Sequence, residues 1–388
     1  MKPKVAIIGA NDFQNQLITK AKEKGYETHV FAWECGDVGE KNADYFYPVS
    51  IVEKEEILEI CKKIQPIGII SIASDLASIT VNYVAEKLGL IGNGIESTIL
   101  STNKHNMRVI FEKNEIPSPK SILVENEQGS KDLKCTFPVI VKPTDRSGSR
   151  GIYKVEALKD LEFAIRRALH ESFEKRVLVE EFAEGEEYSV EYISYNGSHY
   201  FLALTQKYTT GSPKFIETGH LEPAEIDEKI KEDIFKIVEK SLDALKIKNG
   251  ASHSEVKIDK RGNIKVIEIG GRMGGDCIGS DLVELSTGYD FVGLVLDIAC
   301  GKQLILDKKK VPQYSFVKFI FNKMDVDNMI MIQERYPEIV HRISRIEDMD
   351  NDKNIDDSSQ RLGYYIFSTP DKGKMQEVIN LLYGIGEK

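Results

Sequence analysis

The stretch FPVIVKPTDRSGSRG, residues 137–151, joins an apolar run that ends in a lysine to a loop of small residues. The apolar run predicts a strand, and Lys142 would project from the end of this rigid element. Serine and glycine at residues 147–151 let backbone N–H groups approach phosphate oxygens closely. The stretch therefore favours a phosphate-binding site. A lysine at a strand edge followed by a flexible hairpin tip is the alternative.

Composition limits the classes of protein to consider. The 388 residues are too many for one ordinary core, which predicts two to four domains. A formal charge of −10 argues against general nucleic-acid binding. No apolar run approaches the ~20 residues that span a bilayer, and no signal segment precedes the first strand. We therefore expect a cytoplasmic protein without a membrane partner, in which the scattered cysteines (Cys35, Cys61, Cys135, Cys277 and Cys300) are reduced thiols.

Strands and helices alternate in the first hundred residues. This order predicts a parallel sheet covered by helices, with any ligand beyond the carboxyl ends of the strands. Gly9 follows the first strand, but no second or third glycine completes a dinucleotide fingerprint, so we expect no nicotinamide cofactor. The predicted strands cover residues 5–9, 28–33 and 67–73, and the predicted helices cover residues 13–24, 54–64 and 76–88.

The rest of the chain is richer in strands. Asn196-Gly197 predicts a hairpin between strands at residues 188–195 and 200–208. Two further strands, at residues 251–259 and 263–269, flank a short turn. Helices are predicted at residues 101–113, 158–170, 224–245 and 289–300, an exposed loop at residues 348–360, and a small α/β appendage from residue 312, with strands at residues 315–322 and 364–368 and a helix at residues 374–382.

Acidic residues surround the turn between the strands at residues 176–182 and 188–195. Glu180, Glu181 and Phe182 end the first strand, where an extended backbone offers the donors and acceptors that a purine edge requires. The Glu187 carboxylate could accept hydrogen bonds from both hydroxyl groups of a ribose. A solvated acidic turn is the alternative, and it is the preferred interpretation of Glu184 and Glu186.

Two carboxylates flank the turn between the strands at residues 251–259 and 263–269. Glu255 and Glu268 lie at similar distances from the turn, so they can sit side by side on one face. Adjacent carboxylates repel each other unless a cation lies between them, and hard oxygen ligands suit Mg²⁺. A solvated hairpin face is the alternative, but an unpaired carboxylate in the apolar strand around Glu268 would be costly.

These segments, in this order, resemble the ATP-grasp superfamily over roughly residues 1–310. The resemblance implies an α/β and α+β fold. A pre-ATP-grasp parallel α/β domain would cover residues 1–100. A two-lobed ATP-grasp domain with antiparallel sheets would cover residues 101–310, with its smaller lobe at about 118–183. A C-terminal α/β subdomain would cover residues 311–388. Relatives make a homodimer possible.

The resemblance also implies roles for individual residues. The segment NKHNMR, residues 103–108, matches the family's first lysine segment. Lys104 and Lys142 would contact the ATP phosphates, and Mg²⁺ (or Mn²⁺) would bind to Glu255 and Glu268. Arg272 would meet the γ-phosphate and act with Lys142 in catalysis. The remaining ATP contacts would be Ser147, Gly148, Ser149 and Gly151 in the loop, Glu180, Glu181 and Phe182 at the adenine, and Glu187 at the ribose.

One departure from the family pattern is informative. Gly270 stands where relatives often place an asparagine that binds the second metal ion. This variation, and the stretch FIETGHLEPA at residues 215–224, resemble bacterial amino-acid ligases. They imply an enzyme that activates a carboxylate as an acyl phosphate and couples it to an amine. Glu217, His220, His253 and Arg272 would lie near the substrates, and His220 could titrate near neutral pH.

Two alternatives remain open. Purine-pathway ligases, biotin carboxylases and carbamoyl-phosphate synthetases share the arrangement, and Arg146, Arg150 and Lys207 could bind the anions that such enzymes use. A regulatory ATP-binding protein without catalysis is the other alternative, although both lysines, both glutamates and Arg272 argue against it.

Overall fold

The computed structural model describes residues 2–126, 133–212, 214–346, 355 and 357–384, and it contains three sheets. The parallel sheet near the N-terminus has the order β3-β2-β1-β4, which confirms the predicted parallel α/β arrangement. Its strands are β1 (Lys4–Ile8), β2 (Glu27–Phe31), β3 (Tyr45–Tyr47) and β4 (Gly68–Ile70).

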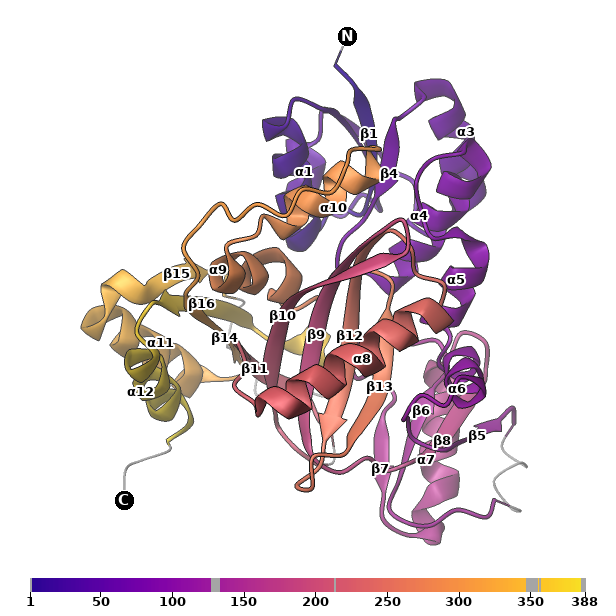
Figure 1. The fold of residues 1–388 in the computed structure, drawn as a ribbon, viewed down its shortest axis with the longest axis vertical. Coiled ribbons are helices and arrows are strands. Elements are labelled where there is room, and N and C mark those ends of the chain that lie inside the picture. The colour runs from indigo at the N-terminus through magenta and orange to yellow at the C-terminus, as the bar shows by residue number, and fades with distance from the viewer. Residues whose placement is uncertain (1, 127–132, 213, 347–354, 356, 385–388) are drawn as a thin grey trace.

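Helices cover both faces of the parallel sheet because alternate side chains of β1 point to opposite faces. Val5 and Ile7 pack with α1 (Asp12–Glu23) and α10 (Phe291–Ala299). Ala6 and Ile8 pack with α3 (Lys54–Ile64) and α4 (Asp75–Leu88). Figure 1 shows α10 beside β1, although it follows far later in the chain. The N-terminal sheet is therefore completed by a helix from outside the first hundred residues.

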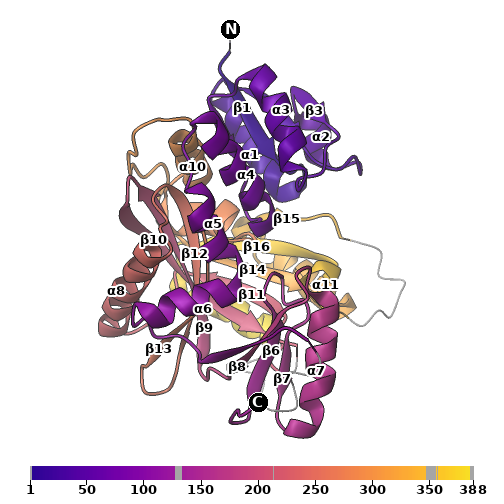
Figure 2. The same ribbon diagram turned by 90° about the vertical axis from the view of Figure 1, so that its right-hand side faces the viewer.

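A pair of short helices leads from this sheet to the small lobe, as Figure 2 shows. They are α5 (Gly94–Thr102) and α6 (Lys104–Lys113). The predicted helix at residues 101–113 is wrong at its start, because the Asn103 side chain accepts hydrogen bonds from two N–H groups of the next turn and begins α6 there. Lys104 consequently occupies the first turn of α6, and α5 was not predicted.

The small lobe is an antiparallel sheet with the order β5-β8-β6-β7, covered by α7 (Leu158–Glu171). The predicted strand at residues 137–143 is present as β6, whereas β5 and β7 were not predicted. The strands are β5 (Ser121–Val124), β6 (Val139–Pro143), β7 (Tyr153–Val155) and β8 (Val177–Glu181).

The third sheet has eight strands in the order β13-β12-β9-β10-β11-β14-β16-β15, with α8 (Glu228–Ala244) packed against it. Asn196 and Gly197 have φ angles of 52° and 83°, so the predicted hairpin between β9 and β10 is confirmed. The strands are β9 (Glu186–Tyr195), β10 (Ser198–Thr209), β11 (Glu217–Glu222), β12 (Gly250–Ile258), β13 (Ile264–Gly270), β14 (Tyr314–Ile320), β15 (Val340–Ile343) and β16 (Gly363–Thr369).

The C-terminal strands extend this large sheet, because β11 pairs with β14 and β14 pairs with β16. Two helices, α11 (Lys323–Arg335) and α12 (Lys372–Tyr383), cover them. Strands β14 and β16 and helix α12 were predicted, whereas α11 and β15 were not. Most of the predicted loop at residues 348–360 lies outside the described residues, and its end forms a short 3-10 turn at Ser358–Gln360.

A buried carboxyl group lies where the C-terminal strands join the sheet. Glu222, in β11, accepts hydrogen bonds from the hydroxyl groups of Thr205 and Ser286. Burial raises the pKa of Glu222 to about 8.

None of the described helices is long and apolar enough to cross a membrane.

Replacing Glu222 tests this placement through the pH dependence of stability. The pKa of Glu222 is about 8 in the folded state against 4.5 ordinarily, so the folded chain binds more protons between these values. The free energy of unfolding should therefore fall with rising pH in that window, by at most ~1.4 kcal/mol per pH unit from this group. Glu222→Gln should gain stability relative to wild type from about pH 5 to about pH 8 in urea unfolding. The exposed control Glu225→Gln should show no such trend. If the free energy of unfolding of Glu222→Gln followed the same pH dependence as that of wild type, the raised pKa of Glu222 would be contradicted.

Candidate functional site

The small lobe and the large sheet enclose a cavity of about 150 Å³. Its wall contains both predicted lysines, both predicted metal-binding carboxylates and most of the predicted loop. Gly151 is the exception among the predicted loop residues: it does not line the cavity, and a Cβ atom there would lie 3.0 Å from Pro143. The predicted residues in the wall are Lys104, Lys142, Ser147, Gly148, Ser149, Glu180, Glu181, Phe182, Glu187, Glu217, His253, Glu255, Glu268 and Arg272.

Lys142 is held by a buried ion pair. Its Nζ lies 2.7 Å from Oε2 of Glu180, and Nε of Arg108 donates to Oε1 of Glu180 at 2.9 Å. Burial alone would raise the pKa of Glu180, but Arg108 and Lys142 hold it below its usual value. The Glu180 carboxylate is thus committed to fixing two cations, and only its backbone remains available for the predicted adenine contact.

Aromatic rings line the same end of the cavity. The Phe182 ring lies 6.2 Å from that of Phe215, with Nζ of Lys154 4.4 Å from the Phe182 ring centre. Lys257 stands over both phenylalanines, at 5.4 Å and 5.5 Å. Phe215 belongs to the connection between β10 and β11 and was not predicted. Two rings and the end of β8 together form a surface suited to a planar base.

Glu255 and Glu268 are direct cross-strand partners in β12 and β13, so the predicted side-by-side arrangement is confirmed. Glu255 Oε1 lies 2.7 Å from Nζ of Lys207, and Glu268 Oε1 lies 2.7 Å from Nζ of Lys104. Lys104 also donates to the backbone oxygen of Arg146 at 2.7 Å, which ties the phosphate loop to Glu268. Each carboxylate meets a cation, and their hard oxygen atoms are suited to Mg²⁺.

Arg272 forms a bidentate ion pair with Asp75 at the start of α4. Nε and Nη2 of Arg272 donate to the two oxygens of Asp75 at 2.7 Å and 2.8 Å. A Cβ atom at Gly270 would lie 2.9 Å from Oδ1 of Asp75. The missing asparagine therefore has a physical reason, because the ion pair occupies the space that a side chain at this position would need.

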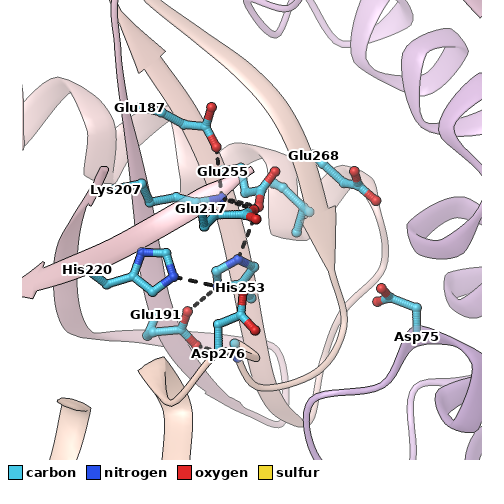
Figure 3. A network of polar contacts seen from close by, with 12 residues as sticks. Asp75, Glu187, Glu191, Lys207, Glu217, His220, His253, Glu255, Glu268 and Asp276 are labelled. Carbon is cyan, nitrogen blue, oxygen red and sulfur yellow. Dashed lines mark hydrogen bonds and ion pairs between the residues drawn. The ribbon is translucent and has the colours of Figure 1, made fainter. Parts of the chain in front are cut away.

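A second, acid-rich cavity of about 170 Å³ adjoins the first. Both cavities are lined by Lys207's partners Glu217 and Glu255 and by Arg272. Nζ of Lys207 lies 2.7 Å from Glu255, 2.8 Å from Glu187 and 3.5 Å from Glu217 (Figure 3). Lys207 thus joins the predicted ribose, metal and substrate residues in one network.

Behind this network His253 is paired with Glu191. Nδ1 of His253 bonds to Glu191, and its Nε2 lies 3.5 Å from Glu255. Burial disfavours the charged imidazole, but the two carboxylates outweigh it and raise the pKa of His253 to about 9. The N–H of Gly274 donates to Glu191 at 3.0 Å, and a Cβ atom there would lie 2.7 Å from Oε1 of Glu191. Glycine is needed here for this close approach.

His220 lines the second cavity but differs from the prediction in its charge. It is 1% exposed, and burial lowers the pKa of its ring below the ordinary value, so it is neutral at neutral pH. Nε2 of His220 lies 4.0 Å from Oδ2 of Asp276. Glu217 also lines the cavity, and burial raises its pKa.

Several residues of the site were missed because their partners lie far away in the sequence. Asp75 lies just beyond the predicted strand at residues 67–73, and this position at the carboxyl end of a parallel strand was the one available signal. Lys207 was considered only as an anion ligand. Arg108 and Phe215 lie in the recognised stretches at residues 103–108 and 215–224 but were given no role, whereas Glu191, Asp276 and Arg361 carried no recognisable pattern.

Comparison with known proteins agrees with this arrangement. Residues 135–281 match the family described as the ATP-grasp domain. Alanine–anticapsin ligase of Bacillus subtilis is 26% identical over 307 residues, which are 70% of this chain and 64% of that protein. The large chain of carbamoyl phosphate synthase from Thermoanaerobacter sp. (strain X514) is 22% identical over 78% of this chain and 29% of its own length. The alignments thus span less than two thirds of these relatives.

Solved structures share the fold over nearly the whole chain. An L-amino acid ligase from Bacillus licheniformis superposes with a TM-score of 0.84 and 22% identity, covering 99% of this chain and 97% of that one. A phosphoribosylglycinamide synthetase from Anaerococcus prevotii gives a TM-score of 0.77 and 21% identity, covering 99% and 98%. The C-terminal strands and helices are therefore part of the shared architecture.

Removing the Glu180 carboxylate tests the ion pairs around Lys142. Glu180→Ala leaves Arg108 and Lys142 as buried charges without that partner, so we expect a loss of about 3–5 kcal/mol in the free energy of unfolding. Urea unfolding measures the loss. Glu181→Ala is the matched control, because the neighbouring carboxylate pairs with Lys265 near the surface and should cost about 1 kcal/mol or less. Equal losses in the two variants would contradict the buried role of Glu180.

Proposed function

Because residues 135–281 are an ATP-grasp domain, we propose that the chain is an Mg·ATP-dependent ligase that activates an amino-acid carboxylate and couples it to an amine. The observation that carries the proposal is the junction of two cavities at Arg272, Glu217 and Glu255. One cavity has the lysines, loop and aromatic surface that suit a nucleotide. The other has excess negative charge beside the end where phosphates would lie.

The first cavity supplies what nucleotide binding requires. Phe182, Phe215 and the end of β8 would hold the base. Lys104 and Lys142 would keep their carboxylate partners and offer their remaining N–H donors to the phosphates. Residues 147–151 would cover those phosphates, since Lys104 already contacts the loop through Arg146. Mg²⁺, bound by Glu255 and Glu268, would neutralise charge on the transferred phosphoryl group.

The second cavity supports a substrate that carries an ammonium group. Glu217 has its Oε2 atom buried without a hydrogen-bond partner among the described residues. A bound ammonium group would satisfy this oxygen. Lining residues and their direct partners comprise six carboxylates (Asp75, Glu187, Glu191, Glu217, Glu255 and Asp276) and four cations (Lys207, Arg272, Arg361 and protonated His253).

The same charges disfavour bicarbonate and ribosyl phosphates. Lys207, which could have bound an anion, is surrounded by three carboxylates. Lys207 is therefore not free to offer a positive pocket to an anionic substrate in the acid-rich cavity.

The reaction follows from this placement. An oxygen of the substrate carboxylate attacks the γ-phosphorus, the bond to ADP breaks, and an acyl phosphate results. The amine then attacks the carbonyl carbon and phosphate leaves. Arg272, held by Asp75, would stand at the junction of the cavities to offset the charge on the phosphoryl group. Closure of the loop would exclude water from the acyl phosphate.

A phosphate-release screen tests the proposal. ATP and Mg²⁺ are supplied with pairs of amino acids, and bicarbonate and purine precursors serve as comparison substrates. Release that requires an amino acid is expected. Release only with bicarbonate or a ribosyl phosphate would favour the other ligases of this fold, and ATP binding without release under any condition would favour a regulatory protein.

Glu268→Gln tests the metal site. The neutral amide is a poorer ligand for Mg²⁺, so we expect ATP turnover to fall by ~10²–10³-fold while the fold remains intact by thermal melting. Glu184→Gln, in the exposed turn before β9, should leave turnover unchanged. Turnover of Glu268→Gln within about tenfold of the parent would exclude the assignment.

Lys142→Ala tests the phosphate lysine. Loss of a charged contact of about 1.5–3 kcal/mol should weaken ATP binding by ~10–100-fold in calorimetry. Lys159→Ala, exposed on α7, is the matched control and should bind like wild type. Unchanged affinity in Lys142→Ala would remove this lysine from the nucleotide site.

A further inference from the structure

One end of the second cavity is lined by an imidazole ring and a carboxylate, in place of the apolar side chains that would enclose a small apolar amino acid. His220 and Asp276 line this end and Arg361 pairs with Asp276; we term these three residues the polar wall. Figure 3 shows His220 and Asp276 below Lys207, on the side of the network away from Glu187. Ser358 also lines the cavity, and its hydroxyl donates to the backbone oxygen of Gly148 at 3.2 Å. The polar wall therefore adjoins the phosphate loop.

The backbone at Asp276 adopts an unfavourable conformation. Asp276 and Cys277 have φ angles of 52° and 66°, two consecutive left-handed residues that are not glycine. Such conformations persist only where surrounding contacts enforce them, and they concentrate at functional sites. Cys277 is buried and Asp276 lines the cavity. The chain thus accepts local strain where it presents this carboxylate.

Arg361 fixes the orientation of Asp276. Nη1 and Nη2 of Arg361 donate to the two oxygens of Asp276 at 3.1 Å and 2.5 Å. Nε of Arg361 donates to the backbone oxygen of Ser358 at 2.8 Å, and its guanidinium lies 3.8 Å from the Phe319 ring centre. Arg361, in the C-terminal segment, therefore supports the carboxylate of Asp276 with both of its terminal nitrogen atoms.

The ring nitrogens of His220 make no close hydrogen bond within the described residues. The ring packs edge-on against Phe319 at 5.4 Å, neither nitrogen has a partner within hydrogen-bonding distance, and Nε2 meets Oδ2 of Asp276 only at 4.0 Å. A neutral imidazole has one donor and one acceptor. An apolar ligand packed here would leave both groups buried and unpaired, which is costly, whereas an amide or hydroxyl group would pair with them.

We infer that the polar wall selects a carboxylate substrate whose side chain carries an uncharged hydrogen-bonding group, an amide or a hydroxyl. This inference rests on the proposed amino-acid ligase function and specifies its substrate class. The ammonium group would lie toward Glu217, the carboxylate toward Arg272, and the side chain against His220 and Asp276. His220 and Asp276 would then be specificity-determining residues, and Arg361 a positioning residue.

Trapping with hydroxylamine measures this selection without knowledge of the amine substrate. The nitrogen of hydroxylamine attacks the carbonyl carbon of the acyl phosphate and loses a proton. The bond from that carbon to the phosphate oxygen breaks, which yields a hydroxamate and phosphate. Full-length protein is given ATP, Mg²⁺, hydroxylamine and one amino acid at a time. The informative comparisons are pairs of similar shape: asparagine with leucine, glutamine with methionine, threonine with valine, and serine with alanine.

In at least one pair, kcat/KM for hydroxamate formation should be at least ~10-fold higher for the polar amino acid than for the apolar one. The apolar side chain would leave buried polar groups of the wall unpaired, and the free-energy penalty of an unpaired group corresponds to a factor of this size or larger. Equal or better use of the apolar member in every pair would overturn the inference and leave the ligase function standing. Absence of hydroxamate with every amino acid, while ATP is hydrolysed with another carboxylate, would instead overturn the proposed amino-acid function together with the inference.

A double variant locates the selection in the wall. Asp276→Leu with Arg361→Met removes both charges together and leaves neither unpaired. The preference for the polar amino acid should fall below about threefold, mainly through KM, while the KM for ATP stays near wild type. The control pair Arg335→Met with Glu377→Leu removes an exposed ion pair in the same region and should keep the preference. A retained preference in a folded Asp276/Arg361 variant would overturn the assignment to the wall. If that variant does not fold, the wild-type pairs and His220→Phe, with the same expected loss, decide the question.

Discussion

The structure depends on the need of two neighbouring carboxylates for positive charge. Glu255 and Glu268 face each other across β12 and β13, and adjacent carboxylates in a half-buried position are unfavourable without cations. Lysines from two other elements supply this positive charge: Lys207 in β10 pairs with Glu255, and Lys104 in α6 pairs with Glu268. Lys104 thus adds an ion pair to the apolar contacts of Met107 and Phe111 that pack α6 against the large sheet.

The same logic extends outward in both directions. Lys207 is shared with Glu187 and Glu217, which brings the start of β9 and the start of β11 to the same point. Arg272, just after β13, reaches Asp75 and connects the N-terminal sheet. The ion pair between Arg361 and Asp276 connects the C-terminal segment. Each structural unit thus contributes a charged group, so the site lies where the units meet.

Features set by near neighbours could be predicted from the sequence. The hairpin at Asn196-Gly197 requires only a local turn preference, and the pairing of Glu255 with Glu268 follows from their spacing about one turn. Long-range ion pairs were not predictable in this way. Arg272 and Asp75 are 197 residues apart, and the covering of β1 by α10 depends on the path of the whole chain. The sequence around Lys207 does not reveal that three carboxylates balance its positive charge, because these partners come from three different strands.

Gly270 shows how these constraints combine at one position. The ATP-grasp resemblance implies a metal-binding asparagine at this position, where the chain has glycine. The structure gives a steric cause, since a Cβ atom would lie 2.9 Å from Asp75 Oδ1 and 3.2 Å from Arg272 Cζ. A side chain at residue 270 and the ion pair between Asp75 and Arg272 compete for the same space. Glycine at residue 270 therefore leaves room for the ion pair with Asp75 that holds Arg272 between the first cavity and the acid-rich cavity.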